Sequence, residues 1–298
     1  MKMNKRKFRE SLAYHAMVLP MLIMFVLFII YPFCSTVFYS FTDYSSFNLF
    51  DYKFVGIQNY LSVFESGNQL AAIEHTIRYA AIITVVQTLI ALFLALTLTV
   101  KFKTSNFLRT LFFFPAVFSP LVVGYLWSFL YSTSNSGPIN QLLQSAGFDK
   151  INFLGDPKIA LYAVLFTQVW QWSGYSMVII IANLKSIDPS LYEVSAIDGA
   201  SKVQQFFHIT LPMLYPSMNV LIVTGIINGL KVYDIIVATT GGGPFYSTIT
   251  IVQSIINQAI GGGYYGQGAA FSVIFLIIIL VLTQLVLRIL NKWEEAIN

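Results

Sequence analysis

Charged residues are scarce in this chain of 298 residues: Asp, Glu, Lys and Arg make up 10% of it, against 56% hydrophobic residues. A typical soluble domain carries about 25% charged residues, so this composition argues against a soluble protein and favours one embedded in lipid. Basic and aromatic residues are not interleaved along any stretch, so we expect no nucleic-acid partner. The composition therefore predicts a multi-pass membrane protein.

The chain also lacks the residue patterns of metal sites and of ATP-binding enzymes. Cys34 is the single cysteine, which excludes an intrachain disulfide and a cysteine-based metal site. His15, His75 and His208 are scattered and have no ligand-like spacing. No Gly-x-x-x-x-Gly-Lys-Ser/Thr sequence is present. We therefore expect that this chain is not an enzyme and holds no cofactor of its own.

Long apolar runs dominate what is present. Each of six stretches is long enough to cross about 30 Å of hydrocarbon as a helix. They lie near residues 15–41, 78–100, 108–131, 160–184, 213–239 and 269–290. We predict an all-α membrane protein with six transmembrane helices. Residues 1–11 form a basic tail, and the connecting segments are too short for a separate soluble domain, so 12–298 should form a single domain.

Lysine and arginine are distributed unevenly between the two sides of these stretches. Twelve lie in the tail, in the second-to-third and fourth-to-fifth connections and at the end of the chain. The other side receives Lys53, Lys150 and Lys158. Because the side richer in Lys and Arg faces the cytoplasm, we predict that both termini and the 188–212 loop are cytoplasmic.

The 188–212 loop is a polar interruption between two apolar runs. Asp188 suits a helix N-cap, and Pro189 suits the first helical position, where its missing N–H costs nothing. Gly199 permits a turn, and a second short helix would carry Phe206. Such a helix–turn–helix beside a membrane fits docking into a groove of another protein. An ordinary connector with interfacial aromatics explains the pattern equally well on physical grounds.

This loop resembles the coupling segment of ABC importer permeases, whose pattern is Glu-Ala-Ala, three residues to Gly, then Ile-x-Leu-Pro. Those places are filled here by Glu193, Val194, Ser195, Gly199, Ile209, Leu211 and Pro212. Small residues follow the two departures from alanine. Three further stretches, 54–60, 112–115 and 233–244, narrow the resemblance to the sugar-importing, maltose-permease-like family, in its first-permease type.

The resemblance implies a type I ABC importer permease fold in a bacterial or archaeal cell membrane. It also implies a second permease in a heterodimer, two cytoplasmic ATPase subunits that bind ATP and Mg, and an extracellular or periplasmic solute-binding protein. The sugar substrate would be an oligosaccharide. The residues expected to couple to the ATPases are Glu193, Ser195, Ala196, Asp198, Gly199, Ala200, Phe206, Leu211 and Pro212.

Polar and aromatic residues in the fourth and fifth apolar stretches are the candidates for the solute pathway. Lys231 and Asp234 lie three residues apart, so they can pair on one helical face, either to position the helix or to contact the solute. Sugars bind between aromatic platforms and hydrogen-bonding groups. The residues that fit are Gln171, Trp172, Gly174, Tyr175, Asn228, Lys231, Tyr233 and Asp234. We assign Trp127, Trp170 and Trp293 to the interfacial belt.

Two other functions are open to such a chain. An ABC permease for a non-sugar solute such as glycerol phosphate would need a cluster of Arg or Lys for the phosphate, and only Lys231 lies near the middle of a stretch. A self-sufficient secondary transporter would need inverted repeats or a coupling-ion site, and neither is visible in the sequence.

Overall fold

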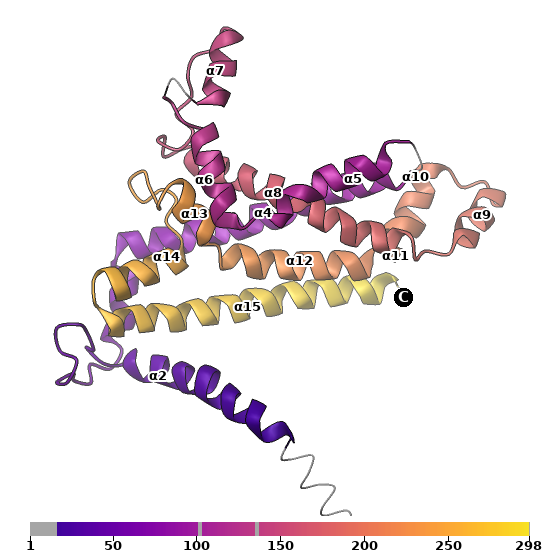
Figure 1. Cartoon of the computed structure of the whole chain (residues 1–298). Helices are drawn as coiled ribbons and strands as arrows, with labels where there is room; N and C mark the ends of the chain where they lie inside the picture. Colours follow the sequence, from indigo (N-terminus) through magenta and orange to yellow (C-terminus); the bar gives the residue numbers. More distant parts are fainter. Residues whose placement is uncertain (1–16, 101–102, 135–136, 298) are drawn as a thin grey trace, which may run out of the picture. The chain divides into compact units, whose positions relative to one another are not determined.

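The computed structural model describes residues 17–100, 103–134 and 137–297, so the basic tail 1–11 lies outside the described residues. Apart from one isolated bridge between Thr42 and Phe54, the regular structure in these residues is helical (Figure 1). The prediction of an all-α protein is confirmed. The chain divides into two compact units, residues 1–65 with 255–276 and residues 66–254 with 277–298, each of which is described by itself.

The first unit contains a long apolar helix, Met17–Tyr39, whose last part is α2 (Tyr31–Tyr39). None of its most apolar window is buried, so its side chains need lipid or another chain around them. The loop that follows leads to α3 (Gln58–Glu65). Asn59 holds this loop, because its Nδ2 donates to the carbonyl oxygens of Ser40 at 2.9 Å and Thr42 at 2.8 Å.

The second unit is built around α4 (Gly67–Thr99), α8 (Ala160–Leu184) and α12 (Tyr215–Leu230), which run side by side (Figure 1). Side chains from all three helices form one apolar cluster, which includes Ala91, Met177 and Leu221. The small side chain of Ala91 takes little room between the helices, so the larger side chains of α8 and α12 can pack closely against α4.

Shorter helices connect and flank these three. They are α5 (Ser105–Phe113), α6 (Pro120–Leu130), α7 (Pro138–Ser145), α9 (Pro189–Ile197), α10 (Lys202–Gln205), α11 (Leu211–Met213) and α13 (Asp234–Thr239). The last two helices along the chain are α14 (Ile251–Ile256) and α15 (Tyr265–Ile297).

Two of the six predicted spans are not straight helices. Four helices are long and apolar enough to cross a membrane alone: Met17–Tyr39, Gly67–Thr99, Ala160–Leu184 and Tyr265–Trp293. The described residues reach six spans only if two bent pairs each count as one span. These pairs are Ser105–Val117 with Pro120–Leu130, bent by 100°, and Lys202–Met213 with Tyr215–Leu230, bent by 62°. The count of six therefore stays a prediction.

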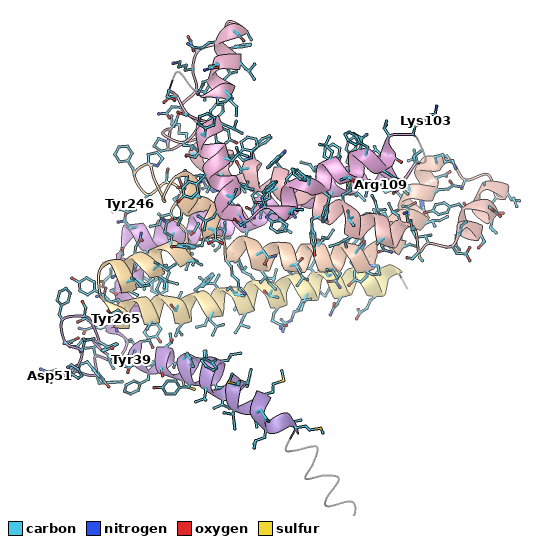
Figure 2. The ribbon with its side chains drawn as sticks, in the orientation of Figure 1. Tyr39, Asp51, Lys103, Arg109, Tyr246 and Tyr265 are labelled. Atoms are coloured by element: carbon cyan, nitrogen blue, oxygen red, sulfur yellow. The ribbon has the colours of Figure 1, made fainter. Side chains whose placement is uncertain are left out.

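The predicted span 108–131 breaks because two residues leave the helical conformation. Phe118 and Ser119 are extended, with ψ of 149° and 147°, and Pro120 starts α6 with the Ser119 side chain as its N-cap. Arg109 (Figure 2) ties α5 to the end of α4, since its Nε donates to the Leu98 carbonyl oxygen at 3.0 Å. This bond satisfies one of the carbonyl groups that a helix end leaves without a partner.

Candidate functional site

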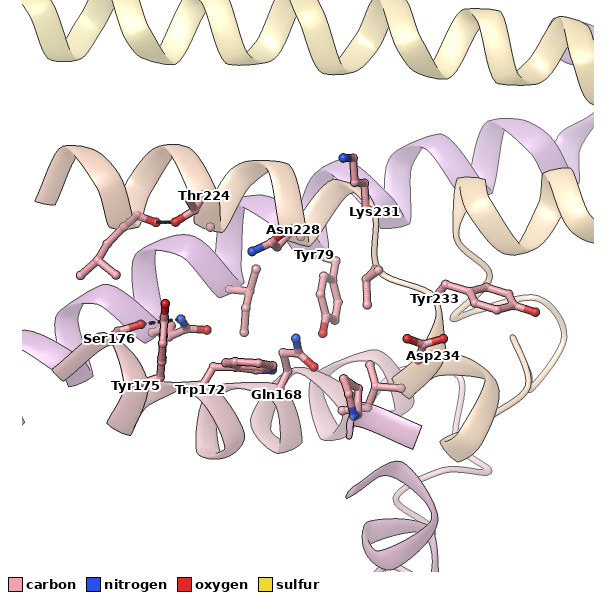
Figure 3. Close-up of a pocket in the computed structure, with 18 residues that line it drawn as sticks. Tyr79, Gln168, Trp172, Tyr175, Ser176, Thr224, Asn228, Lys231, Tyr233 and Asp234 are labelled. Atoms are coloured by element: carbon pink, nitrogen blue, oxygen red, sulfur yellow. Dashed lines mark hydrogen bonds between the residues drawn. The ribbon is translucent and has the colours of Figure 1, made fainter. Parts of the chain in front are cut away.

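A cavity of about 520 Å³ lies in the second unit, where α4 and α8 face the junction between α12 and α13 (Figure 3). Small-molecule sites occupy about 300–1,000 Å³, so its size suits a solute. Six of the eight residues predicted for the solute pathway line it: Trp172, Tyr175, Asn228, Lys231, Tyr233 and Asp234. The rings of Trp172 and Tyr175 meet edge to face, with centroids 5.9 Å apart.

Gln171 and Gly174 do not line the cavity, which corrects their predicted placement. Gln171 is fully buried, and its Nε2 donates to the Phe118 carbonyl oxygen at 2.9 Å. Gly174 packs against the backbone of Phe112. Residues three or four apart share a helix face, so 171 and 174 face the broken helix pair while 168, 172 and 175 face the cavity.

The predicted pair between Lys231 and Asp234 is wrong. α12 ends at Leu230, Tyr233 has φ −146° and ψ −62°, and α13 begins at Asp234, so the two residues do not share a helix. Both side chains are exposed, and no ion pair joins them in the described part of the chain. Figure 3 shows Lys231 at the end of α12 and Asp234 at the start of α13, on different sides of the helix break. The break brings both charges to the cavity separately.

Most of the polar cavity residues that were not predicted from the sequence come from α4 and α8. Gln87 of α4 donates through Nε2 to the Ser176 hydroxyl oxygen of α8 at 2.9 Å. Tyr79 of α4 and Gln168 of α8 also line the cavity. The position of Gln168 was predictable from the sequence, because it precedes Trp172 by four residues and so lies on the same helix face. The position of Tyr79 was not, since one aromatic in an apolar run is typical of a core.

Trp127 is a buried residue and not the belt residue that its position predicts. Its side chain is 9% exposed. Its ring centroid lies 5.1 Å from that of Tyr131, 5.5 Å from that of Phe166 and 5.3 Å from that of Trp170. The bend before α6 turns this ring toward α8, where aromatic neighbours cover it.

The 188–212 segment forms the predicted helix–turn–helix. The Asp188 carboxylate caps α9 by accepting from the Ser190 N–H at 2.9 Å, and hydrogen bonds from Ser190 lower the pKa of Asp188. Gly199 makes the turn with φ +82°, a conformation that glycine adopts without strain. α10 continues through the π-helical turn Phe206–Thr210 into α11, so Phe206 lies in the second short helix, as predicted.

Hydrogen bonds hold the two arms of this segment together. Gln205 Nε2 donates to the Tyr192 carbonyl oxygen at 3.2 Å and to the Ser195 hydroxyl oxygen at 2.9 Å. The hydroxyl groups of Tyr192 and Thr210 lie 2.9 Å apart. Ser195 therefore faces the inside of the segment. Of the other residues predicted for coupling, Glu193, Ala196, Asp198 and Gly199 are exposed, and Ala200, Phe206, Leu211 and Pro212 are half-buried.

The exposed apolar stripe on α9 consists of residues that the sequence analysis did not single out. Leu191, Val194 and Ile197 are spaced by three residues, and Ile197 is 85% exposed. Residues at this spacing lie along one side of a helix. An apolar stripe on a helix with no buried residues of its own is a surface suited to a protein partner.

Residues 87–295 match the family described as binding-protein-dependent transport system inner membrane component. The chain belongs to this family. It is 33% identical over 277 residues to the probable ABC transporter permease protein YurN of Bacillus subtilis, covering 92% of this chain and 94% of the relative. It is 31% identical over 286 residues to the trehalose/maltose transport system permease protein MalF of Thermococcus litoralis, covering 96% of each.

A third relative has a different solute in its name. The sn-glycerol-3-phosphate transport system permease protein UgpA of Escherichia coli is 32% identical over 289 residues, covering 97% of each chain. The fold is similar to a chain in the crystal structure of a bacterial alginate ABC transporter in complex with alginate pentasaccharide-bound periplasmic protein. The TM-score is 0.83 at 23% identity, over 97% of each chain.

Membership in this family confirms the resemblance seen in the 188–212 segment. The protein is a multi-pass membrane permease subunit of a binding-protein-dependent ABC importer. It is a transport subunit and not an ATPase.

Proposed function

We propose that this permease subunit forms part of the translocation pathway for a sugar. The observation that carries the proposal is the lining of the cavity, where Trp172 and Tyr175 lie among uncharged hydrogen-bonding groups such as Asn228 and Gln168. Sugars present apolar C–H faces and hydroxyl edges, which aromatic rings and amides match. The relative from Thermococcus litoralis, whose name gives trehalose and maltose as its solutes, supports the same class of substrate.

Glycerol phosphate fits this cavity less well. A phosphate group is bound by clustered Arg or Lys side chains. Among the described residues, Lys231 is the one cation that lines the cavity, and Asp234 adds a negative charge to the same lining. This charge balance favours a neutral solute over the anion named for the Escherichia coli relative.

The proposed assembly is a heteromeric importer in a bacterial or archaeal membrane. A second permease would supply the rest of the pathway, and two ATPase subunits would bind ATP and Mg. A solute-binding protein would deliver the sugar from outside. Six spans with both termini in the cytoplasm would place the 188–212 segment against the ATPases, and its exposed stripe of Leu191, Val194 and Ile197 supports this contact.

The test is reconstitution of the permease in proteoliposomes with its candidate partner permease, ATPase and binding protein. Uptake and solute-stimulated ATP hydrolysis are measured with maltose, trehalose, other neutral saccharides and sn-glycerol-3-phosphate. We expect stimulation by a neutral saccharide. Stimulation by sn-glycerol-3-phosphate alone would refute the sugar proposal, and uptake by this chain without partners or ATP would refute the coupled importer.

A side-chain variant tests the cavity itself. Trp172→Ala removes an aromatic platform, so we expect reduced sugar uptake by a complex that assembles normally. Trp170→Ala is the matched control, because Trp170 is on the same helix but does not line the cavity. Equal uptake in the two variants would place the pathway elsewhere.

A further inference from the structure

Two cavity residues carry buried polar atoms that have no hydrogen-bond partner among the described residues. They are the Tyr79 hydroxyl oxygen and the Gln168 Oε1 atom. Tyr79 comes from α4 and Gln168 from α8, and Figure 3 shows the Tyr79 hydroxyl and the Gln168 amide directed into the same space. Buried polar groups in native proteins are normally hydrogen-bonded, so two unpaired polar atoms that face one cavity point to a ligand group between them.

The Tyr79 hydroxyl has no evident role in holding the fold. The side chain is fully buried, and its ring packs in an apolar cluster with Ile83, Val232 and Ile235. A phenylalanine ring would fill the same volume without burying an unpaired hydroxyl. The apolar cluster thus fixes the ring and leaves the hydroxyl at the cavity.

The chemistry of the two atoms defines the group that would satisfy both. The phenolic hydroxyl can both donate and accept, and the amide oxygen only accepts. A bridging group must therefore donate to Gln168 Oε1, and it uses the Tyr79 O–H as well if it also accepts, as a hydroxyl does. An ionised phosphate oxygen cannot donate to the amide oxygen, and an ammonium group would leave the Tyr79 O–H without an acceptor.

We propose that Tyr79 and Gln168 form a subsite for one hydroxyl group of the transported sugar, an inference that rests on the proposed function. Trp172 lies one turn after Gln168 on the same face of α8, where its ring can stack on the sugar that carries this hydroxyl. The subsite makes α4 a third wall of the pathway, in addition to α8 and the α12–α13 junction.

Tyr79→Phe tests the subsite because it removes one oxygen atom and keeps the ring. Binding of the neutral saccharide with the highest uptake, with maltose and trehalose as first probes, is measured on the purified permease–ATPase complex without binding protein. Loss of one hydrogen bond should raise Kd about three- to tenfold. The melting temperature should not fall, because the hydroxyl makes no bond within the described structure.

Two further variants sharpen the test. Tyr162→Phe is the matched control, since Tyr162 is on α8, half exposed and outside the cavity, and its Kd should equal that of the wild type. Gln168→Leu should raise Kd by a similar factor to Tyr79→Phe. If both residues hold the same hydroxyl, the double variant should lose less than the product of the two single effects.

The outcomes separate the subsite from the proposed function. A wild-type complex that binds and transports a neutral saccharide, with unchanged Kd in Tyr79→Phe, overturns the subsite alone. A lowered melting temperature that accompanies weaker binding assigns Tyr79 a structural role and also overturns it. Independent, multiplying effects of the two variants overturn the shared hydroxyl. A wild-type complex that transports no neutral saccharide overturns the proposed function and the subsite with it.

Discussion

Gly174 is the position where one methyl group should disturb both packing and transport. A Cβ added there would lie 1.9 Å from the Phe112 carbonyl oxygen, 2.3 Å from the Phe112 carbonyl carbon and 2.7 Å from the Phe113 nitrogen. Real Cβ atoms essentially never approach closer than 3.0 Å. Since these neighbours are backbone atoms, no rotamer change relieves the overlap, and α5 and α8 would have to separate.

The size of the effect follows from two opposing terms. Overpacking costs about 1–3 kcal/mol and occasionally more, and a backbone overlap this deep belongs at the upper end. Replacing glycine by alanine inside a helix stabilises the helix by about 1 kcal/mol. We expect a net loss of about 2 kcal/mol, which lowers the melting temperature by roughly 4–8 °C for a domain of this size.

The assay is thermal unfolding of the purified complex together with sugar uptake. Gly174→Ala should lower both, because Gly174 lies between Trp172 and Tyr175 of the cavity. Gly67→Ala is the control, since a Cβ added at Gly67 meets no atom within 4 Å. A Gly174→Ala protein with wild-type melting temperature and uptake would refute the close contact between α5 and α8.

Three other variants test features outside that contact. Gly199→Asn should keep sugar-stimulated ATP hydrolysis while Gly199→Val loses it, because φ +82° suits asparagine far better than a β-branched residue. Equal ATP hydrolysis in the two variants would contradict a requirement for positive φ at this turn. Lys231→Met and Asp234→Asn should have additive effects on the melting temperature, since no ion pair joins them, and a coupling energy in the double variant would contradict this. The lowered pKa of Asp188 means that its carboxylate stabilises the start of α9 at neutral pH and loses this effect as pH falls through the lowered pKa. The protection of the Ser190 amide, measured as its exchange rate relative to the intrinsic rate at each pH, should therefore fall in acid, and Asp188→Ala should remove that pH dependence of the protection.

Local sequence signals determined the helical class and several element bounds. The fourth apolar stretch was predicted at 160–184 and is observed as Ala160–Leu184. Asp188 and Pro189 start α9, and Gly199 makes the turn that follows it. These features were predictable because hydropathy, capping and positive φ depend on residues within a few positions of one another.

Only the tertiary structure decided how the cavity is assembled. The separation of Lys231 from Asp234 depends on a helix break that no local residue pattern predicted. Tyr79 reaches the cavity because α4 packs on α8 and α12, far away in sequence. Gln171 faces Phe118 because the third stretch bends by 100° beside it. Sequence alone therefore determined the helical class and the family, whereas packing between distant segments decided which polar atoms face the cavity.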